Sequence, residues 1–367
     1  MISFDASKVS QVSYNQIIPE NILLADMERT PYIYQVGLNP SDNCNHKCPW
    51  CYTQNRRNDK SIQLNKLYGY FSKFIKFGGK SVVMTGGGEP LLYKELYQPT
   101  KEFENSSITK YLINNSIWVG LITNGELLDK FINADFDIKK LMIIRVSLDA
   151  TNKKEHSLRH QCDETSFNKI CDSIYKSVCL RGNSKTPAIG ISFVISCKDD
   201  INNTLHDITE ICNLAKLLKV DFVQFKHLNT KNMNEAYNDL ENIHRYCMKN
   251  MWNDIEFWVQ KYKSVLNQKC LVTQYLQEIG KNNNRFPCCY NYGETRYFNQ
   301  ADFSPNGRII ENCNTSTCRF NEINTILNSE NKWKYEKVLI NSLKKFGFHP
   351  YRFTPTAPEV FLPFICE

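Results

Sequence analysis

The sequence lacks any apolar run of the roughly 18 residues that a membrane-spanning helix needs, and its basic residues form no clusters. Residues 1–29 mix acidic, basic and amide side chains, which is unlike a secretory signal peptide. Lys and Arg total 45 against 38 Asp and Glu, so the formal net charge is +7. An excess this mild does not predict a nucleic-acid partner. We therefore expect a cytoplasmic protein that binds neither a membrane nor nucleic acid.

Repeats, low-complexity tracts and Gly/Ser-rich linkers are also absent, whereas cysteine is abundant, at 15 of 367 residues. Cytoplasmic thiols stay reduced, so we expect metal ligands, catalytic groups or small buried side chains rather than disulfides. The hydrophobic content of 42% is enough for one large core and a smaller appended unit.

Six short apolar runs rich in β-branched residues predict the strands of a sheet. They lie at 33–38, 81–85, 118–123, 142–148, 188–195 and 221–225. Between them, the segments 64–77, 167–179 and 205–218 have helical patterns. Strands that alternate with helices predict a parallel sheet covered by helices. The predicted fold class is therefore α/β, a partial (β/α)6 TIM-like barrel, because six units fall short of the eight in a full barrel.

The pattern changes after His227. Residues 232–263 have the pattern of one long helix or a helix pair, and a Pro-Asn-Gly turn occurs further on, within 304–307. We expect that turn to join 297–303 and 308–310 in a hairpin. The predicted divisions are an N-terminal extension at 1–32, the barrel at 33–230, a helical connector at 231–264 and a small cysteine-bearing domain at 265–367.

A loop with three cysteines, Cys44, Cys48 and Cys51, directly follows the first predicted strand. Ligands collect at the carboxyl ends of parallel strands, so this loop lies where chemistry is expected. The spacing allows one loop to hold three irons of a cubane cluster and to leave the fourth iron open. A zinc site is the alternative, since His46 or a distant residue can supply the fourth ligand that structural zinc requires.

The C-x3-C-x2-C spacing, with Trp50 before the last cysteine, resembles the radical S-adenosylmethionine (SAM) superfamily. The resemblance implies a 4Fe–4S cluster on the three cysteines and SAM bound to its open iron. It further implies reductive cleavage of SAM to a 5′-deoxyadenosyl radical, which abstracts a hydrogen atom from the substrate. An electron donor of the flavodoxin or ferredoxin type would be the partner.

Further motifs occur in the order that this superfamily has. Gly87-Gly88-Glu89-Pro90 resembles its GGEP motif, which contacts the amino group of the cofactor's methionine; on its own the glycine run would predict only a tight turn. Polar residues after the third and fourth strands resemble those that bind methionine and ribose hydroxyls. The cofactor-binding residues implied by the resemblance are Trp50, Tyr52, Gly87, Gly88, Glu89, Thr123, Asn124, Ser147, Asp149, Arg159 and Ser192.

Two of these positions have alternative interpretations. Asp149 precedes a helical pattern, so it also fits a helix cap. The segment from His156 to Arg159 resembles the HDxxRG-like segment of related enzymes, in which the arginine meets the cofactor carboxylate. Here Ser157 stands where the aspartate is expected, and His160 stands in place of the glycine.

The C-terminal cysteines resemble the start of a SPASM or twitch domain, which carries an auxiliary 4Fe–4S cluster. The full seven-cysteine pattern is absent, so one auxiliary cluster is predicted rather than two. Four cysteines suit zinc equally well, which leaves a zinc site as the alternative. The candidate ligands are Cys289, Cys313, Cys318 and Cys366, any of which Cys270 or Cys288 can replace.

The resemblance to SPASM and twitch domains implies modification of a ribosomally synthesised peptide or protein by crosslinking, thioether formation or epimerisation. The alternative substrate is a small molecule, such as a sugar, aminocyclitol or nucleotide sugar. A non-catalytic iron–sulfur or zinc module is the alternative of another class. No pattern selects a hydrogen-donating catalytic residue, and the other cysteines are expected to be buried apolar groups. They are Cys162, Cys171, Cys179, Cys197, Cys212 and Cys247.

Overall fold

The computed structural model describes most of the barrel segment and parts of the C-terminal segment. The described residues are 33–51, 53–54, 61–195, 201–227, 255–260, 263–280, 283–288 and 310–318, with a few positions between 242 and 249 and between 324 and 328.

Six parallel strands have the predicted order, and their bounds agree with the prediction to within two residues. They are β1 (Gln35–Leu38), β2 (Ser81–Met84), β3 (Trp118–Thr123), β4 (Leu141–Ser147), β5 (Ala188–Ile195) and β6 (Phe222–His227). The helices are α3 (Leu64–Lys76), α4 (Ile108–Asn114), α5 (Leu128–Ile132), α6 (Lys153–His160), α7 (Thr165–Arg181) and α8 (Ile201–Leu218). Short 3-10 turns are η2 (Pro90–Leu92), η3 (Lys94–Leu96), η4 (Lys101–Phe103), η5 (Ile138–Lys140) and η6 (Val272–Gln274).

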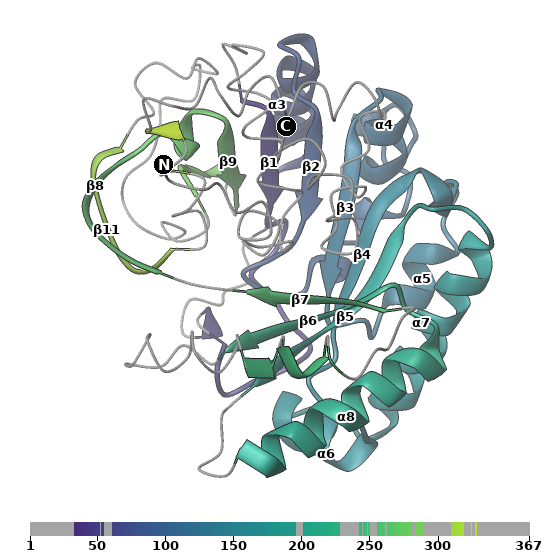
Figure 1. Ribbon diagram of the computed structural model, residues 1–367. Coiled ribbons are helices and arrows are strands. Elements are labelled where there is room, and N and C mark those ends of the chain that lie inside the picture. The colour runs from purple at the N-terminus through teal and green to yellow at the C-terminus, as the bar shows by residue number, and fades with distance from the viewer. Residues whose placement is uncertain are drawn as a thin grey trace, which may run out of the picture.

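These strands belong to a nine-stranded sheet of order β10-β9-β1-β2-β3-β4-β5-β6-β7. β7 (Glu256–Gln260) runs parallel to β6, and β9 (Leu276–Ile279) runs parallel to β1. Only β10 (Arg285–Phe286) pairs in the antiparallel sense among these nine strands. The strands turn from upright at β1–β3 to nearly horizontal at β5–β7, so the sheet is strongly curved (Figure 1). The fold is therefore mixed α/β with a mostly parallel sheet, as a partial TIM-like barrel has.

The predicted helix over 232–263 is only partly right. Helical residues occur between 242 and 249, but Glu256–Gln260 forms strand β7. Ile255 and Phe257 are both buried, two residues apart, which is the spacing of one face of a strand. The apolar period of two at this point of the segment is what distinguishes the strand from a helix.

Strands β9 and β10 lie beyond the predicted boundary at 265, yet they join the main sheet beside β1. β8 (Lys263–Cys270) and β11 (Ile310–Cys318) form a separate antiparallel pair with an irregular register. Ile310, expected to end a hairpin with 297–303, pairs with Cys270 of β8. The remainder of that hairpin falls outside the described residues, as do Tyr52, Cys197, Cys289 and Cys366.

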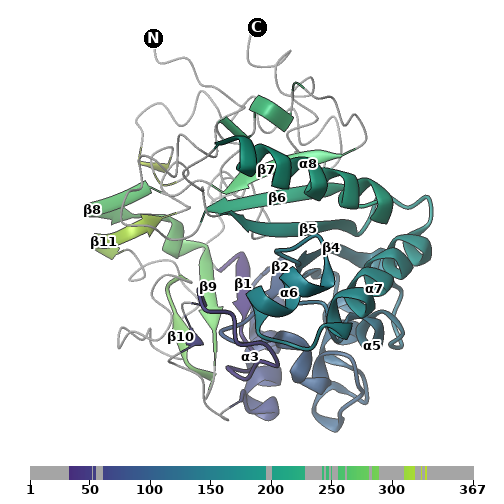
Figure 2. The same ribbon diagram turned by 90° about the horizontal axis from the view of Figure 1, so that it is seen from below.

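The helices cover the outer face of the sheet (Figure 2) and enclose the main hydrophobic core with it. Helix α3 shows why: Leu67, Phe71 and Phe74 recur at the spacing of one helical face, and all three are fully buried. None of the described helices is long and apolar enough to cross a bilayer. Of the cysteines expected to be buried, Cys212 and Cys247 are buried, Cys162 and Cys171 are half-buried, and Cys179 is exposed.

The inner face of the sheet holds a second, smaller apolar cluster of Ile143, Ala188 and Phe222. The Phe222 ring lies over Gly190 of β5, where an added Cβ would come within 2.3 Å of the ring. Phe222 and Gly190 are paired in the register of β5 and β6, so the absent side chain is what makes room for the ring.

Replacing Gly190 by alanine should therefore lower the unfolding free energy by about 1–3 kcal/mol, because a fully buried ring must move. Gly69→Ala is the matched control: Gly69 lies exposed within α3 with no atom within 4 Å of an added Cβ. That substitution should stabilise the protein by about 0.5–1 kcal/mol. Urea unfolding followed by circular dichroism measures the unfolding free energy of both variants. Equal changes in that free energy would show that the Phe222 ring does not restrict the side chain at position 190.

Candidate functional site

The cysteine loop lies at the carboxyl end of β1 and is held by backbone hydrogen bonds from two other segments. Glu89 N–H donates to the Asn43 carbonyl at 2.7 Å, and Gly88 N–H donates to the Ser41 carbonyl at 3.2 Å. From the other side, Lys47 N–H donates to the carbonyl of His160 at 2.9 Å. The loop conformation is therefore set by the turn after β2 and by the end of α6.

Cys44 and Cys51 lie close enough to Cys48 to affect the pKa of its thiol, and all three residues are half-buried. The pKa of Cys48 rises to about 12, first because the thiol is buried and then because Asp149, Cys44 and Cys51 carry like charges nearby. Thiolates gathered this way repel one another until cations bind them, so this donor set fits a metal cluster. His46, Cys48 and His160 also place one ligand atom each within 4.8 Å of one another, close enough for a single metal ion.

The Gly87-Gly88-Glu89 turn packs directly on the cysteine loop. A Cβ at Gly88 would lie 2.0 Å from the Asn43 carbonyl oxygen, so only glycine fits there. The Thr53 hydroxyl, just beyond the last cysteine, donates to the Gly87 carbonyl. The glycines are thus required for close approach of two backbones, and not only for a tight turn.

Glu89 is 2% exposed and its carboxylate is firmly held. It accepts hydrogen bonds from Thr123 Oγ1 at 2.6 Å, from Asn124 N–H at 2.7 Å and from Leu91 N–H at 3.0 Å. Burial raises the pKa of Glu89 to about 7, and these three hydrogen bonds oppose the rise. Glu89, Thr123 and Asn124, predicted from separate motifs, therefore form one connected group at the ends of β2 and β3.

This group reaches the cysteine loop through Asn45. Asn124 Nδ2 donates to Asn45 Oδ1 at 2.8 Å, and Asn45 Nδ2 donates to Glu126 Oε2 at 2.7 Å. The same Glu126 oxygen lies 2.8 Å from His46 Nε2. Glu126 and Asn45 were not predicted from the sequence, and the only signal for either was its place beside a motif at a strand end.

Asp149 follows β4 with a backbone φ of 54° and is 3% exposed. Its Oδ1 accepts a hydrogen bond from Val194 N–H at 2.6 Å, and its Oδ2 lies 3.2 Å from His160 Nε2. Burial acts to raise the pKa of Asp149, but His160 and Lys226 together hold it below its usual range. Asp149 is not a helix cap, because the N-cap of α6 is Asn152, whose side chain accepts from Glu155 N–H.

Ser147 and Ser192 lie side by side in neighbouring strands, with their hydroxyl oxygens 3.5 Å apart. Trp50 is half-buried and turns its ring edge-on to His160, with centroids 6.1 Å apart. These three predicted residues thus lie at the same end of the sheet as the cysteine loop.

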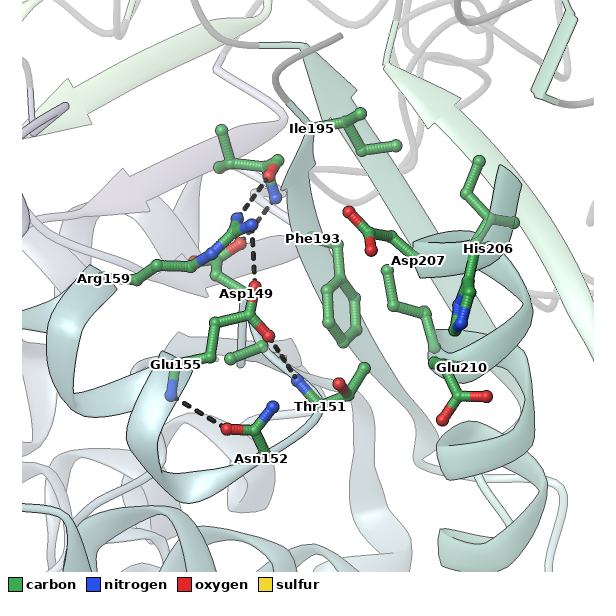
Figure 3. A pocket seen from close by; sticks show the side chains of 14 residues that line it. Asp149, Thr151, Asn152, Glu155, Arg159, Phe193, Ile195, His206, Asp207 and Glu210 are labelled. Atoms are coloured by element: carbon green, nitrogen blue, oxygen red, sulfur yellow. Dashed lines mark hydrogen bonds and ion pairs between the residues drawn. The ribbon is translucent and has the colours of Figure 1, made fainter. Parts of the chain in front are cut away.

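Arg159 lines a pocket of about 380 Å³ between α6 and α8 (Figure 3). Its guanidinium pairs with Glu155 Oε1 at 2.8 Å and donates to the Val194 carbonyl at 3.3 Å. Phe193, which also lines the pocket, belongs to the core between sheet and helices. The pocket therefore lies on the helix-covered side of β5, and contact of Arg159 with a cofactor carboxylate stays a prediction.

Three buried histidines lie behind the cysteine loop. The rings of His156 and His160 stack at 4.4 Å with planes 14° apart, and His46 meets His160 edge-on at 5.1 Å. The pKa of His156 falls to about 3, first through burial and then through the neighbouring histidines. This cluster was not predicted from the sequence, although the spacing of four between His156 and His160 places both on one face of a helix.

Two of the predicted auxiliary ligands, Cys313 and Cys318, lie in β11 and pair with Gln268 and Lys263 of β8. Cys270 is close enough to Cys313 for a Cys313 thiolate to raise its pKa, although burial is the larger cause of the rise to about 11. The described residues thus bring Cys270 and Cys313 near each other at one end of the strand pair.

The segment that holds the site is similar to known proteins. The model of the Radical SAM superfamily matches residues 38–177, which contain the cysteine loop, the glycine turn and Asp149. A probable GTP 3′,8-cyclase of Sulfurisphaera tokodaii is 25% identical over 230 residues, covering 60% of this chain and 65% of that protein. An uncharacterized protein of Archaeoglobus fulgidus is 28% identical over 143 residues, covering 37% of this chain and 31% of that protein. The chain thus spans less than two thirds of either relative.

Solved structures share the fold at low sequence identity. SuiB of Streptococcus suis bound to S-adenosylmethionine has a TM-score of 0.53 and 14% identity, over 75% of this chain and 66% of that one. The enzyme anSMEcpe with bound AdoMet and Kp18Cys peptide has a TM-score of 0.50 and 14% identity, over 83% of each chain. Likeness at this level of identity concerns the fold alone.

The raised pKa of Glu89 predicts a loss of stability as the pH rises from about 4.5 to about 7. In that window the folded protein keeps a proton on Glu89 that the unfolded chain has released, so rising pH favours unfolding. Relative to Glu89→Gln, the wild-type unfolding free energy should fall by up to about 3 kcal/mol. Urea unfolding without iron, at several pH values, measures the difference. A difference that does not vary with pH would mean that Glu89 titrates normally.

Proposed function

We propose that Cys44, Cys48 and Cys51 hold a 4Fe–4S cluster to which SAM binds, since all three lie in the segment 38–177 that matches the model of the Radical SAM superfamily. The observation that carries the proposal is the contact between the cysteine loop and the Gly87-Gly88-Glu89 turn, which joins a three-thiol donor set to a buried carboxylate. A reduced cluster held by these cysteines would supply the electron for cleavage of SAM, and the resulting 5′-deoxyadenosyl radical would take a hydrogen atom from the substrate.

The residues of the chain would bind and orient the cofactor. Glu89, fixed by three hydrogen bonds, is suited to accept from the ammonium group of the methionine part. Ser147 and Asp149 at the end of β4, with Ser192 paired beside Ser147 in β5, would offer hydroxyl and carboxylate oxygens to the ribose. Because each of these groups is held by a strand end, the cofactor would be oriented without further ordering of side chains.

For the substrate, we favour a ribosomally synthesised peptide or protein that is crosslinked, converted to a thioether or epimerised. Two structures of similar fold support this choice: SuiB bound to the precursor peptide SuiA, with a TM-score of 0.54, and anSMEcpe bound to the Kp18Cys peptide, with 0.50.

A small-molecule substrate is the second candidate, and the sequence relative named as a probable GTP 3′,8-cyclase favours it. That relative matches 60% of this chain at 25% identity, which is a higher identity than either peptide-bound structure has. Product mass separates the outcomes, since loss of two hydrogens indicates oxidation or crosslinking. Gain of one deuterium from heavy water at constant composition indicates epimerisation.

An auxiliary 4Fe–4S cluster in the C-terminal segment is the further part of the proposal. The ligand set proposed from sequence is Cys289, Cys313, Cys318 and Cys366. The closeness of Cys270 to Cys313 favours Cys270 as a replacement for Cys318, which lies five residues further along β11.

Replacing Cys44, Cys48 and Cys51 together by alanine should abolish dithionite-driven formation of 5′-deoxyadenosine after anaerobic reconstitution. The control is a Cys171→Ala, Cys179→Ala double variant, which removes two thiols of helix α7 and should keep full cleavage. Chromatography of the products measures both. Persistent cleavage in the triple variant would refute the proposed function.

Replacing Cys313 by serine should remove about four of about eight irons bound per chain, because a 4Fe–4S cluster normally requires its cysteine ligands. Cleavage of SAM should survive, since the first cluster does not use Cys313. Iron and sulfide analysis of the reconstituted variant measures the loss. Unchanged iron content would contradict an auxiliary cluster at this position.

A further inference from the structure

His160, the last residue of α6, contacts the cysteine loop at three consecutive residues. Its carbonyl accepts from Lys47 N–H at 2.9 Å. Its Nδ1 lies 3.1 Å from His46 Nδ1 and 3.5 Å from Cys48 Sγ. With 2% of its surface exposed, His160 makes these contacts without competition from water.

The hydrogen-bond partners decide which nitrogen carries the proton. His46 Nε2 lies 2.8 Å from a carboxylate oxygen of Glu126, which can only accept, so His46 carries its hydrogen on Nε2. In the neutral ring, His46 Nδ1 is then an acceptor. The facing Nδ1 of His160 must therefore be the donor, with its N–H directed at the space between His46 and the sulfur of Cys48.

The opposite side of the His160 ring is fixed by Asp149. Nε2 is 3.2 Å from Asp149 Oδ2, within ion-pair distance though not aligned as a regular hydrogen bond. The carboxylate can only accept, so the ring that makes both contacts carries a hydrogen on each of its nitrogens. Asp149 is in turn held by Val194 N–H at 2.6 Å. The stacked His156 ring covers one face, and the Trp50 ring lies edge-on to the imidazole. The imidazole is thus restrained by contacts on both of its nitrogens and on one face.

We propose that His160 is a positioning residue that directs an N–H group at the sulfur of Cys48 and links that sulfur to Asp149. The inference rests on the proposed function, in which Cys48 binds the cluster. A hydrogen bond to a cluster sulfur stabilises the reduced, more negative form and so raises the reduction potential. One ring would therefore join the residue expected to bind ribose to the group that supplies the electron.

The test compares reduction potentials in reconstituted full-length protein. His160→Phe keeps a ring of similar size but removes both nitrogens, whereas His160→Asn keeps an N–H near the position of Nδ1. His156→Phe is the matched control, because His156 is equally buried and stacked, yet its Nδ1 lies 3.5 Å from the sulfur of Cys162 rather than that of Cys48. Redox titration followed by electron paramagnetic resonance, on the signal that SAM perturbs, gives the potential of the cluster.

We expect His160→Phe to shift the ratio of oxidised to reduced cluster about tenfold toward the oxidised form, a potential lower by roughly 59 mV. His160→Asn should recover most of the shift, and His156→Phe should match wild type. A wild-type potential in His160→Phe, with the cluster fully assembled, would overturn the inference and leave the proposed function intact. Failure of wild type to take up iron or to cleave SAM would instead remove the proposed function.

If His160→Phe does not assemble its cluster, His160→Asn and His160→Gln decide the matter. Gln extends its amide toward Asp149 rather than toward Cys48, so its potential should be the lower of the two. Equal potentials would overturn the inference. Binding of Co²⁺ to a Cys44→Ser, Cys51→Ser chain would also overturn the inference, if the complex showed a thiolate charge-transfer band and a further His160→Asn substitution abolished that band. That result would assign Cys48 and His160 to a mononuclear metal site.

Discussion

Contact between two backbones, without intervening side chains, positions the whole site. Asn43 and Gly88 approach so closely that a methyl group on Gly88 would overlap the Asn43 carbonyl, and the adjacent N–H of Glu89 donates to that same carbonyl. This contact fixes the cysteine loop of β1 against the turn of β2. Glu89 then reaches the end of β3 through Thr123 and Asn124. If the two backbones separated, the thiols and the carboxylate would no longer face the same space.

Burial of charge is the second constraint, since Glu89 and Asp149 are both almost fully enclosed. Such groups are stable only when their oxygens have partners. Burial raises the pKa of Glu89 although three neutral donors oppose the rise, whereas the pKa of Asp149 falls because the carboxylate faces His160 and Lys226. The pKa values of the two carboxyl groups shift in opposite directions because their neighbours differ, although both groups lie just after parallel strands of one sheet.

The sequence predicted those parts of the molecule that depend on local pattern. The six central strands were found because each is a short buried run, and the cysteine spacing identified the loop between β1 and α3. Strands β7 and β9 were missed because they are short and lie in segments without a clear following helix. The link from Asp149 through His160 to Cys48 was also missed, since it joins residues about a hundred positions apart. No local pattern encodes such a pairing, even though Cys48 and Asp149 were each predicted as site residues.

The place of β9 has a consequence for the order in which the protein assembles. β9 supplies the second neighbour of β1, and Asn39 at the end of β1 donates to Glu278 of β9 at 2.8 Å across 239 residues of chain. Contacts of such long range form late, because the loop between them must first be closed. During synthesis, the strand that leads into the cysteine loop therefore remains an open edge until more than three quarters of the chain has emerged. Insertion of a cluster into a fully formed loop would have to wait until β9 has paired with β1.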